Sequence, residues 1–283
     1  MKIFIVALLY SNFSFSYYGV DNRMEYHETK EEELKEIAKA MAFQTYRDDS
    51  YGWDFNRLWQ MKSMTLEQRG VCSEERFIEQ PTFSRETCSA VLISPKHLLT
   101  AGNCLTEHYC KNDLFYWMFN YHLESESPFS LKRPRKDYYQ CKNILKRVYD
   151  PNSFNSFAII ELKKEVEGVR PVTISKTPLQ KGDELIVMGH SFGMPLKIAF
   201  DAEVIKDHDK FVFVNSDIAG NNHGSILLNA KTLELEGILI NGRKDYSPSE
   251  NGCHASERLY KDEAREVGLK MTQIYKFLET IGL

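Results

Sequence analysis

The sequence predicts an all-β protein made of antiparallel strands. From about residue 86 onward, short segments rich in β-branched and aromatic residues alternate with turn signals such as SPK (94–96) and QKGD (180–183). No strand–helix–strand alternation accompanies them, so the pattern is typical of an antiparallel sandwich or barrel rather than a parallel sheet. The expected strands cover residues 89–93, 97–101, 114–119, 157–162, 184–189, 210–215, 225–230 and 235–241.

A helix is expected near each end of the chain. Residues 30–43 (KEEELKEIAKAMAF) place acidic residues early and apolar residues at helical spacing, which predicts one amphipathic helix. Its apolar positions are Leu34, Ile37, Ala38 and Met41. Residues 267–283 place apolar side chains on one helical face, which predicts a helix docked on the β-body. These side chains are Leu269, Ile274, Phe277, Leu278 and Ile281.

The first residues have the pattern of a signal peptide. Lys2 supplies a short positive region, an apolar run covers residues 3–10, and small residues at Ser14 and Ser16 predict a cut before Tyr17. The run is too short to cross a hydrocarbon core, which takes about 20 residues in a helix. We therefore expect residues 1–16 to be a signal peptide, and the mature protein to be secreted or periplasmic with no membrane span.

Composition excludes some classes of partner. The 283-residue chain is 42% hydrophobic and long enough to bury a sizeable core. Its 36 basic and 40 acidic residues give a net charge of −4, so no nucleic-acid partner is indicated. The basic run 132–136 (KRPRK) is interpreted as a solvated loop, with a polyanion-binding patch as the alternative.

Cysteine usage indicates structural disulfides. The chain has six cysteines, an even number that suits an exported protein. No CxxC or CxxH spacing supports a zinc site, so no metal and no cofactor is predicted.

Four segments, in order, resemble the trypsin-like serine proteases. CSAVLISP (88–95) with LLTAGNC (98–104) resembles the paired strands that lead to the family's catalytic histidine. SFAIIEL (156–162) resembles the strand that begins with its aspartate, and DIAGNNHGS (217–225) resembles the loop of its nucleophile. MGHSFGMPLK (188–197) is similar to the bacterial glutamyl-endopeptidase-like branch. The resemblance covers roughly residues 70–280 and implies two packed antiparallel β-barrels.

The resemblance also implies that all three catalytic positions are substituted. Asn103 stands at the histidine position, Ser156 at the aspartate position and His223 at the nucleophile position. An amide cannot act as the general base, so no catalytic residue is expected. The oxyanion-hole positions fall on Asn221 and His223, and asparagine tolerates the left-handed backbone that glycine would adopt there.

Disulfide pairings and domain limits follow from the same resemblance. The family's hairpin implies a Cys88–Cys104 bond, with Cys110–Cys141 as the second choice and Cys72–Cys253 left by elimination. We expect the protease-like domain over residues 71–283. Residues 17–70 are expected to be an N-terminal extension or pro-region that contains a helix.

The resulting hypothesis is an exported pseudoprotease whose former active-site cleft binds a peptide or protein. One alternative is an active serine endopeptidase in which the triad is misaligned and Ser225 is the nucleophile. A second alternative is a structural surface protein that uses the barrels as a scaffold.

Overall fold

The structure, a computed structural model, describes most of the chain. The described residues are 15–16, 18–51, 58–83, 87–126, 130–218, 220–242, 246–257, 259–260, 262–264 and 266–283. The expected signal peptide therefore lies outside the described residues except for Phe15–Ser16, which form the short strand β1. Within this described part, no helix is long and apolar enough to span a membrane.

The C-terminal half forms a closed six-stranded antiparallel barrel. Its strands follow the order β16-β19-β20-β23-β18-β17, and a pairing between β16 and β17 closes the ring. The bounds are β16 Glu184–Gly189, β17 Lys197–Asp207, β18 Phe211–Asn215, β19 Ile226–Asn229, β20 Leu235–Asn241 and β23 Glu266–Lys270. Alternate residues of β16 pack into two different hydrophobic cores. Leu185 and Val187 pack with side chains inside the barrel, whereas Ile186 and Met188 belong to the main core, which the barrel shares with the N-terminal sheet.

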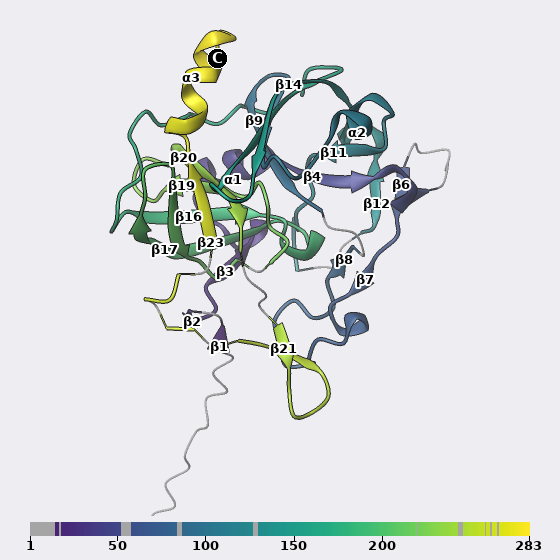
Figure 1. Ribbon diagram of the computed structural model, residues 1–283. Helices are drawn as coiled ribbons and strands as arrows, with labels where there is room; N and C mark the ends of the chain where they lie inside the picture. The colour runs from purple at the N-terminus through teal and green to yellow at the C-terminus, as the bar shows by residue number, and fades with distance from the viewer. Residues whose placement is uncertain are drawn as a thin grey trace, which may run out of the picture.

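The N-terminal half forms a seven-stranded antiparallel sheet curved into a half-barrel. Its order is β13-β11-β4-β9-β10-β15-β14. The bounds are β4 Met41–Tyr46, β9 Ser89–Ser94, β10 His97–Thr100, β11 Phe115–Met118, β13 Tyr138–Tyr139, β14 Cys141–Asp150 and β15 Asn155–Leu162. Leu92, Leu98 and Ile159 of this sheet share the main core with Ile186 and Met188 of the barrel. The expected all-β architecture of two packed antiparallel bodies is thus confirmed, and Figure 1 shows both.

The first predicted helix is shorter than expected. Helix α1 covers Glu32–Lys39, and Met41 already begins β4. Residues Met41–Phe43 pair with β9 and are almost completely buried, so pairing with a distant strand replaces the last turn of the expected helix. An apolar run of this kind fits a buried strand as well as a helix.

Segments before residue 71 contribute strands to both bodies. β4 lies between β9 and β11 in the N-terminal sheet, and β3 (Arg23–Glu25) pairs with β17 at the edge of the barrel. The boundary expected at residue 71 does not separate these strands from the β-structure. We propose that the folded domain includes the segment from residue 18 onward.

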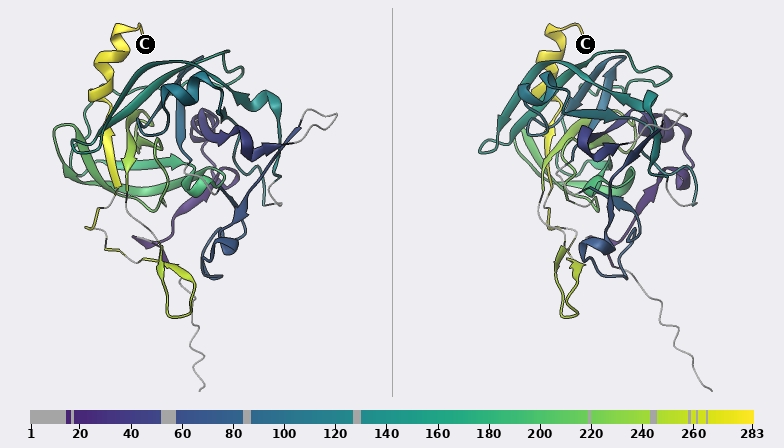
Figure 2. Two further views of the ribbon diagram at one scale, coloured as in Figure 1. Left: turned by 45° about the vertical axis from the view of Figure 1, so that its right-hand side comes forward. Right: turned by 90° about the vertical axis from the view of Figure 1, so that its right-hand side faces the viewer.

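The predicted C-terminal helix is also shorter than expected, because the first part of the segment 267–283 belongs to a strand. Leu269 lies in β23, a strand of the barrel, and helix α3 covers only Thr272–Thr280. Ile274 and Leu278 of α3 are fully buried, which confirms a terminal helix docked on the β-body. Figure 2 shows α3 at the opposite end of the molecule from the hairpin of β21 (Tyr246–Pro248) and β22 (His254–Ser256).

All six cysteines form the three expected disulfides. These are Cys88–Cys104, Cys110–Cys141 and Cys72–Cys253. Cys88–Cys104 closes the β9–β10 hairpin, Cys110–Cys141 joins helix α2 (Glu107–Lys111) to β14, and Cys72–Cys253 joins an N-terminal segment to the hairpin of β21 and β22. Each bond restricts the unfolded chain, an effect of about 2–4 kcal/mol in typical cases.

The basic run 132–136 is not a simple loop. Lys132–Pro134 form β12, which pairs with β6 (Leu58–Met61), and Arg135–Asp137 form the 3-10 helix η4. Backbone pairing with β6 therefore holds residues 132–134 in a strand, where the sequence pattern predicted a solvated loop.

Candidate functional site

Asn103 and His223, which are 120 residues apart, are in side-chain contact. The Asn103 amide nitrogen Nδ2 donates a hydrogen bond to Nδ1 of His223. Asn103 lies in the turn that follows β10 of the N-terminal sheet, and His223 lies in the loop between β18 and β19 of the barrel. The two bodies therefore meet at these two side chains, both of which are partly exposed.

The turn that carries Asn103 is held from three directions. The Cys88–Cys104 disulfide fixes its end. The buried side chain of Gln44 in β4 donates from Nε2 to the carbonyl oxygen of Cys104 at 2.6 Å. A side chain at Gly102 would overlap the carbonyl oxygen of Val148, so the turn requires glycine for close packing against β14. The position of Asn103 is thus set by the fold and not by its own side chain.

Ser156 joins the site through the backbone of this turn. It belongs to β15, is only 3% exposed, and its Oγ accepts a hydrogen bond from the backbone N–H of Gly102 at 3.0 Å. A serine at this position therefore satisfies a buried amide of the turn. The structure brings together the three positions that the sequence predicts to correspond to the triad: Asn103 contacts His223, and Ser156 binds the residue before Asn103.

The loop of His223 is anchored on the N-terminal sheet. The backbone N–H of Ser89 in β9 donates to the carbonyl oxygen of His223 at 2.8 Å. Gly224 has φ +82° and lies so close to Ser89 that a Cβ there would overlap the Ser89 carbonyl oxygen. Asn221, which the sequence predicts as the first oxyanion-hole position, is exposed and has φ +51°, a left-handed backbone that asparagine tolerates. The loop therefore has a sharply turned backbone, with positive φ at Asn221 and Gly224.

Ser225, the alternative nucleophile, points into the interior. Its side chain is fully buried, and its Oγ donates to Oγ of Ser89 at 3.4 Å. A side chain at Gly189 would overlap the Ser225 hydroxyl, which leaves that hydroxyl tightly enclosed. Ser225 therefore contributes to packing behind the loop, while the side chain of His223 faces Asn103.

The guanidinium of Arg147 is anchored beside Asn103. Nε of Arg147 in β14 donates to the carbonyl oxygen of Gly102 at 2.7 Å, and its guanidinium lies 5.6 Å from the ring centre of Tyr149. Arg147 was missed by sequence reasoning because exposed residues of a strand carry no motif. In the described residues, no group of three or more His, Cys, Asp and Glu side chains could hold a metal ion.

Two titratable groups in segment 188–197 are deeply buried. Burial lowers the pKa of His190 to about 3, so its imidazole is neutral, and its Nδ1 lies 3.3 Å from the carbonyl oxygen of Met194. Burial also lowers the pKa of Lys197 to about 8, although an ion pair with Glu25 at 3.1 Å opposes this change. Both groups support the fold around the site, and neither contacts Asn103 or His223 in the interactions described.

Comparison with known proteins agrees with this architecture. Residues 72–197 match the family model described as Trypsin, a range that includes Asn103 and Ser156 and ends before His223. No curated protein matches the chain. A solved structure of a glutamyl endopeptidase is similar over 93% of this chain and 98% of its own, with a TM-score of 0.52 and 13% identity. At that identity the likeness concerns the fold alone.

Proposed function

We propose that this chain, a trypsin-like serine protease homologue with the chymotrypsin fold, has no peptidase activity and binds a peptide or protein ligand in its former active-site cleft. The contact between Asn103 and His223 carries the proposal, because the sequence resemblance assigns these positions to the general base and the nucleophile of the family. No cofactor is needed for such a role.

The chemistry of the side chains supports loss of catalysis. In the family's mechanism a serine oxygen attacks the scissile carbonyl, a histidine accepts the serine proton, and an aspartate orients the histidine. Here an amide replaces the base, an imidazole replaces the nucleophile, and the Ser156 hydroxyl is occupied by the Gly102 N–H. Removing triad members lowers the rate by about 10⁴- to 10⁶-fold, which leaves hydrolysis close to background.

The burial of Ser225 favours this proposal over an active endopeptidase. A nucleophile must reach a substrate carbonyl, and a fully buried hydroxyl that donates to Ser89 does not. His223 is two residues away, and its Nδ1 accepts a hydrogen bond from Asn103.

Binding can persist without the triad. An extended peptide forms backbone hydrogen bonds with an exposed strand edge, and these bonds need no catalytic side chain. The disulfides and the expected signal peptide support export to an oxidising compartment, either secreted or periplasmic. A structural surface protein would share these features and would differ only in having no ligand at the cleft.

Active-site labelling tests the loss of activity. The purified mature chain should not react with a serine-directed fluorophosphonate and should not cleave a broad peptide library above the buffer background. The combined change Asn103→His, Ser156→Asp and His223→Ser should recover measurable labelling, whereas His223→Ser or Asn103→His alone should not. Strong labelling of the unmodified chain that Ser225→Ala abolishes would establish the endopeptidase instead.

A cleft-blocking variant tests the binding role. A peptide selected from a displayed library against the unmodified chain should lose at least about tenfold in affinity when Asn103→Trp fills the cleft. Asn152→Trp, which places the same ring on the exposed β14–β15 turn, should leave the affinity unchanged. Equal binding to both variants, or no selectable peptide, would favour the structural surface protein.

A further inference from the structure

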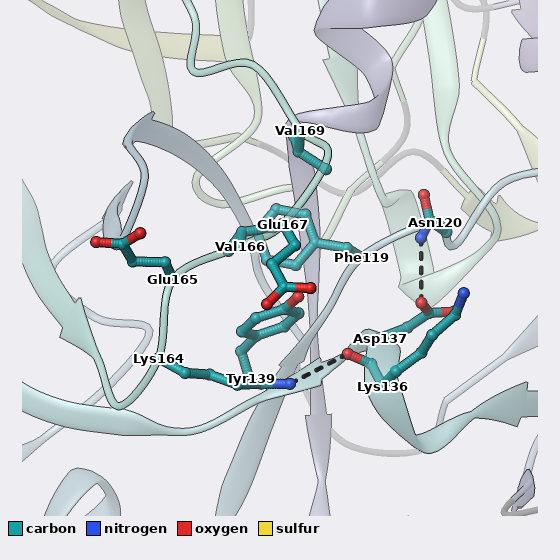
Figure 3. Close-up of a pocket in the computed structure, with 10 residues that line it drawn as sticks. All are labelled: Phe119, Asn120, Lys136, Asp137, Tyr139, Lys164, Glu165, Val166, Glu167 and Val169. Carbon is teal, nitrogen blue, oxygen red and sulfur yellow. Dashed lines mark hydrogen bonds between the residues drawn. The ribbon is translucent and has the colours of Figure 1, made fainter.

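A second candidate site lies in a cavity away from Asn103 and His223. The cavity has a volume of about 310 Å³ and is lined by residues that follow β11, by η4 and β13, and by the loop after β15. Figure 3 shows its lining, which includes an apolar wall formed by Phe119, Val166 and Val169. None of the lining residues belongs to the Asn103–His223 site, so the peptide-binding proposal does not use this cavity.

Asp137 places an incompletely satisfied carboxylate in the cavity wall. The residue is only 7% exposed, and one carboxylate oxygen, Oδ1, accepts from Nδ2 of Asn120 at 3.2 Å. Within the described ranges, its second oxygen accepts no hydrogen bond and the carboxylate forms no ion pair within 4.0 Å. Burial raises the pKa of Asp137, although the hydrogen bond from Asn120 and the charges of Arg133, Lys136 and Lys164 oppose this change. Buried carboxylates are normally paired, so this one is a candidate to receive a cation.

Two lysines place positive charge at the mouth of the same cavity. Lys136 and Lys164 are exposed, and both line the cavity. Nζ of Lys164 donates to the carbonyl oxygen of Lys136 at 3.4 Å and lies 4.3 Å from the ring centre of Tyr139. This contact holds an ammonium group at the rim, while the Asp137 carboxylate lies in the wall (Figure 3).

The side chains of the two acidic residues in the loop after β15, Glu165 and Glu167, point in different directions. Figure 3 shows the Glu167 carboxylate next to the ring of Tyr139, whereas the Glu165 carboxylate points away from the other lining side chains. Glu165 is therefore a suitable control position, because it carries the same charge on the same loop and its carboxylate points away from the other lining side chains.

We propose that this cavity binds a small zwitterion of the amino-acid class. The ligand's ammonium group would pair with the second oxygen of Asp137, its carboxylate would pair with Lys136 and Lys164, and its hydrocarbon part would lie on the apolar wall. A volume of about 310 Å³ is at the small end of ligand sites, which suits a ligand of this size. An ammonium alone would meet the two rim lysines unfavourably, and a carboxylate alone would leave Asp137 unpaired.

A ligand series on the unmodified protein tests the two charges separately. The probes are 6-aminohexanoic acid, hexylamine and hexanoic acid, measured by isothermal titration calorimetry at one ionic strength and near neutral pH. The zwitterion should bind at least about tenfold more tightly than either singly charged probe, since each charged hydrogen bond adds about that factor. Equal affinities for the zwitterion and hexylamine, or no binding of the zwitterion, would overturn the proposal.

Variants locate the binding in this cavity. Asp137→Asn, which keeps the shape of the side chain, should lower the affinity for 6-aminohexanoic acid about tenfold and remove its advantage over hexanoic acid. Glu165→Gln, which removes a carboxylate that points away from the other lining side chains, should leave both affinities unchanged. Equal affinities in Asp137→Asn and the unmodified protein would place the binding elsewhere and overturn the assignment. If Asp137→Asn does not fold, the ligand series above still decides.

Discussion

Nζ of Lys197 lies 3.1 Å from Oε1 of Glu25, and both residues are almost completely buried. The same ammonium donates to Oε1 of Gln80 and to the carbonyl oxygen of Pro195, each at 2.7 Å, and lies 4.7 Å from the ring centre of Phe77. Lys197 begins β17 and Glu25 ends β3, so this ion pair joins the N-terminal segment to the barrel.

Breaking this ion pair from one side should destabilise the protein strongly. Glu25→Gln leaves the Lys197 ammonium buried without its carboxylate, and such a change costs about 3–5 kcal/mol. The double variant Glu25→Gln, Lys197→Met should lose less than Glu25→Gln alone, because no buried charge is left uncompensated. Urea unfolding of the two single variants and the double variant measures the coupling. Additive losses would show that the two side chains do not interact.

The same lysine should make stability depend on alkaline pH. Burial lowers its pKa to about 8 in the folded protein, below its ordinary value of 10.5. Between these two values the unfolded chain binds more protons than the folded chain, so the free energy of unfolding should rise with pH. The rise is at most about 3 kcal/mol. Unfolding curves at pH 7.5, 9 and 10 should show it in the unmodified protein and in the exposed control Lys231→Met, but not in Lys197→Met.

This ion pair also shows where prediction from the sequence ended. Glu25 and Lys197 are 172 residues apart, and neither belongs to a local pattern that indicates a partner. By contrast, the strand expected over residues 184–189 coincides with β16, because its apolar run is bounded by turn residues on both sides. Local patterns predicted where strands lie. The end of α1 and the pairing of β3 with β17 depend instead on contacts between distant segments, which local patterns do not indicate.

The candidate site was predictable to a similar extent. The order of the motifs predicted that Asn103, Ser156 and His223 correspond to the triad of the trypsin-like proteases and lie together. The structure brings the three residues together. The support around them was not predictable, because Gln44 and Arg147 reach the turn from separate strands. The cavity beside Asp137 likewise needs three segments that are adjacent only in the folded chain.

Removing the Ser156 hydroxyl should weaken the turn that carries Asn103. Ser156→Ala leaves the buried N–H of Gly102 without its acceptor, a loss of about 1–3 kcal/mol in the free energy of unfolding. Ser153→Ala, which removes a hydroxyl from a partly exposed turn, should cost less than about 1 kcal/mol. Thermal and urea unfolding compare the two variants. Equal stabilities would mean that the Ser156 hydroxyl does not satisfy the turn.

Close packing at Gly102 gives the sharpest test of how the site is built. A Cβ at this residue would overlap the carbonyl oxygen of Val148, a backbone atom that cannot move without shifting β14. Gly102→Ala should therefore destabilise the protein by about 3 kcal/mol or more and should change the NMR signals of the His223 ring, since Asn103 is the next residue. Gly242→Ala is the matched control, because nothing lies within 4 Å of the added methyl group and the backbone is not left-handed. This control should leave both stability and the His223 signals unchanged. If Gly102→Ala were tolerated as well as Gly242→Ala, β14 would not support the Asn103 turn, and the position of Asn103 against His223 would need another cause.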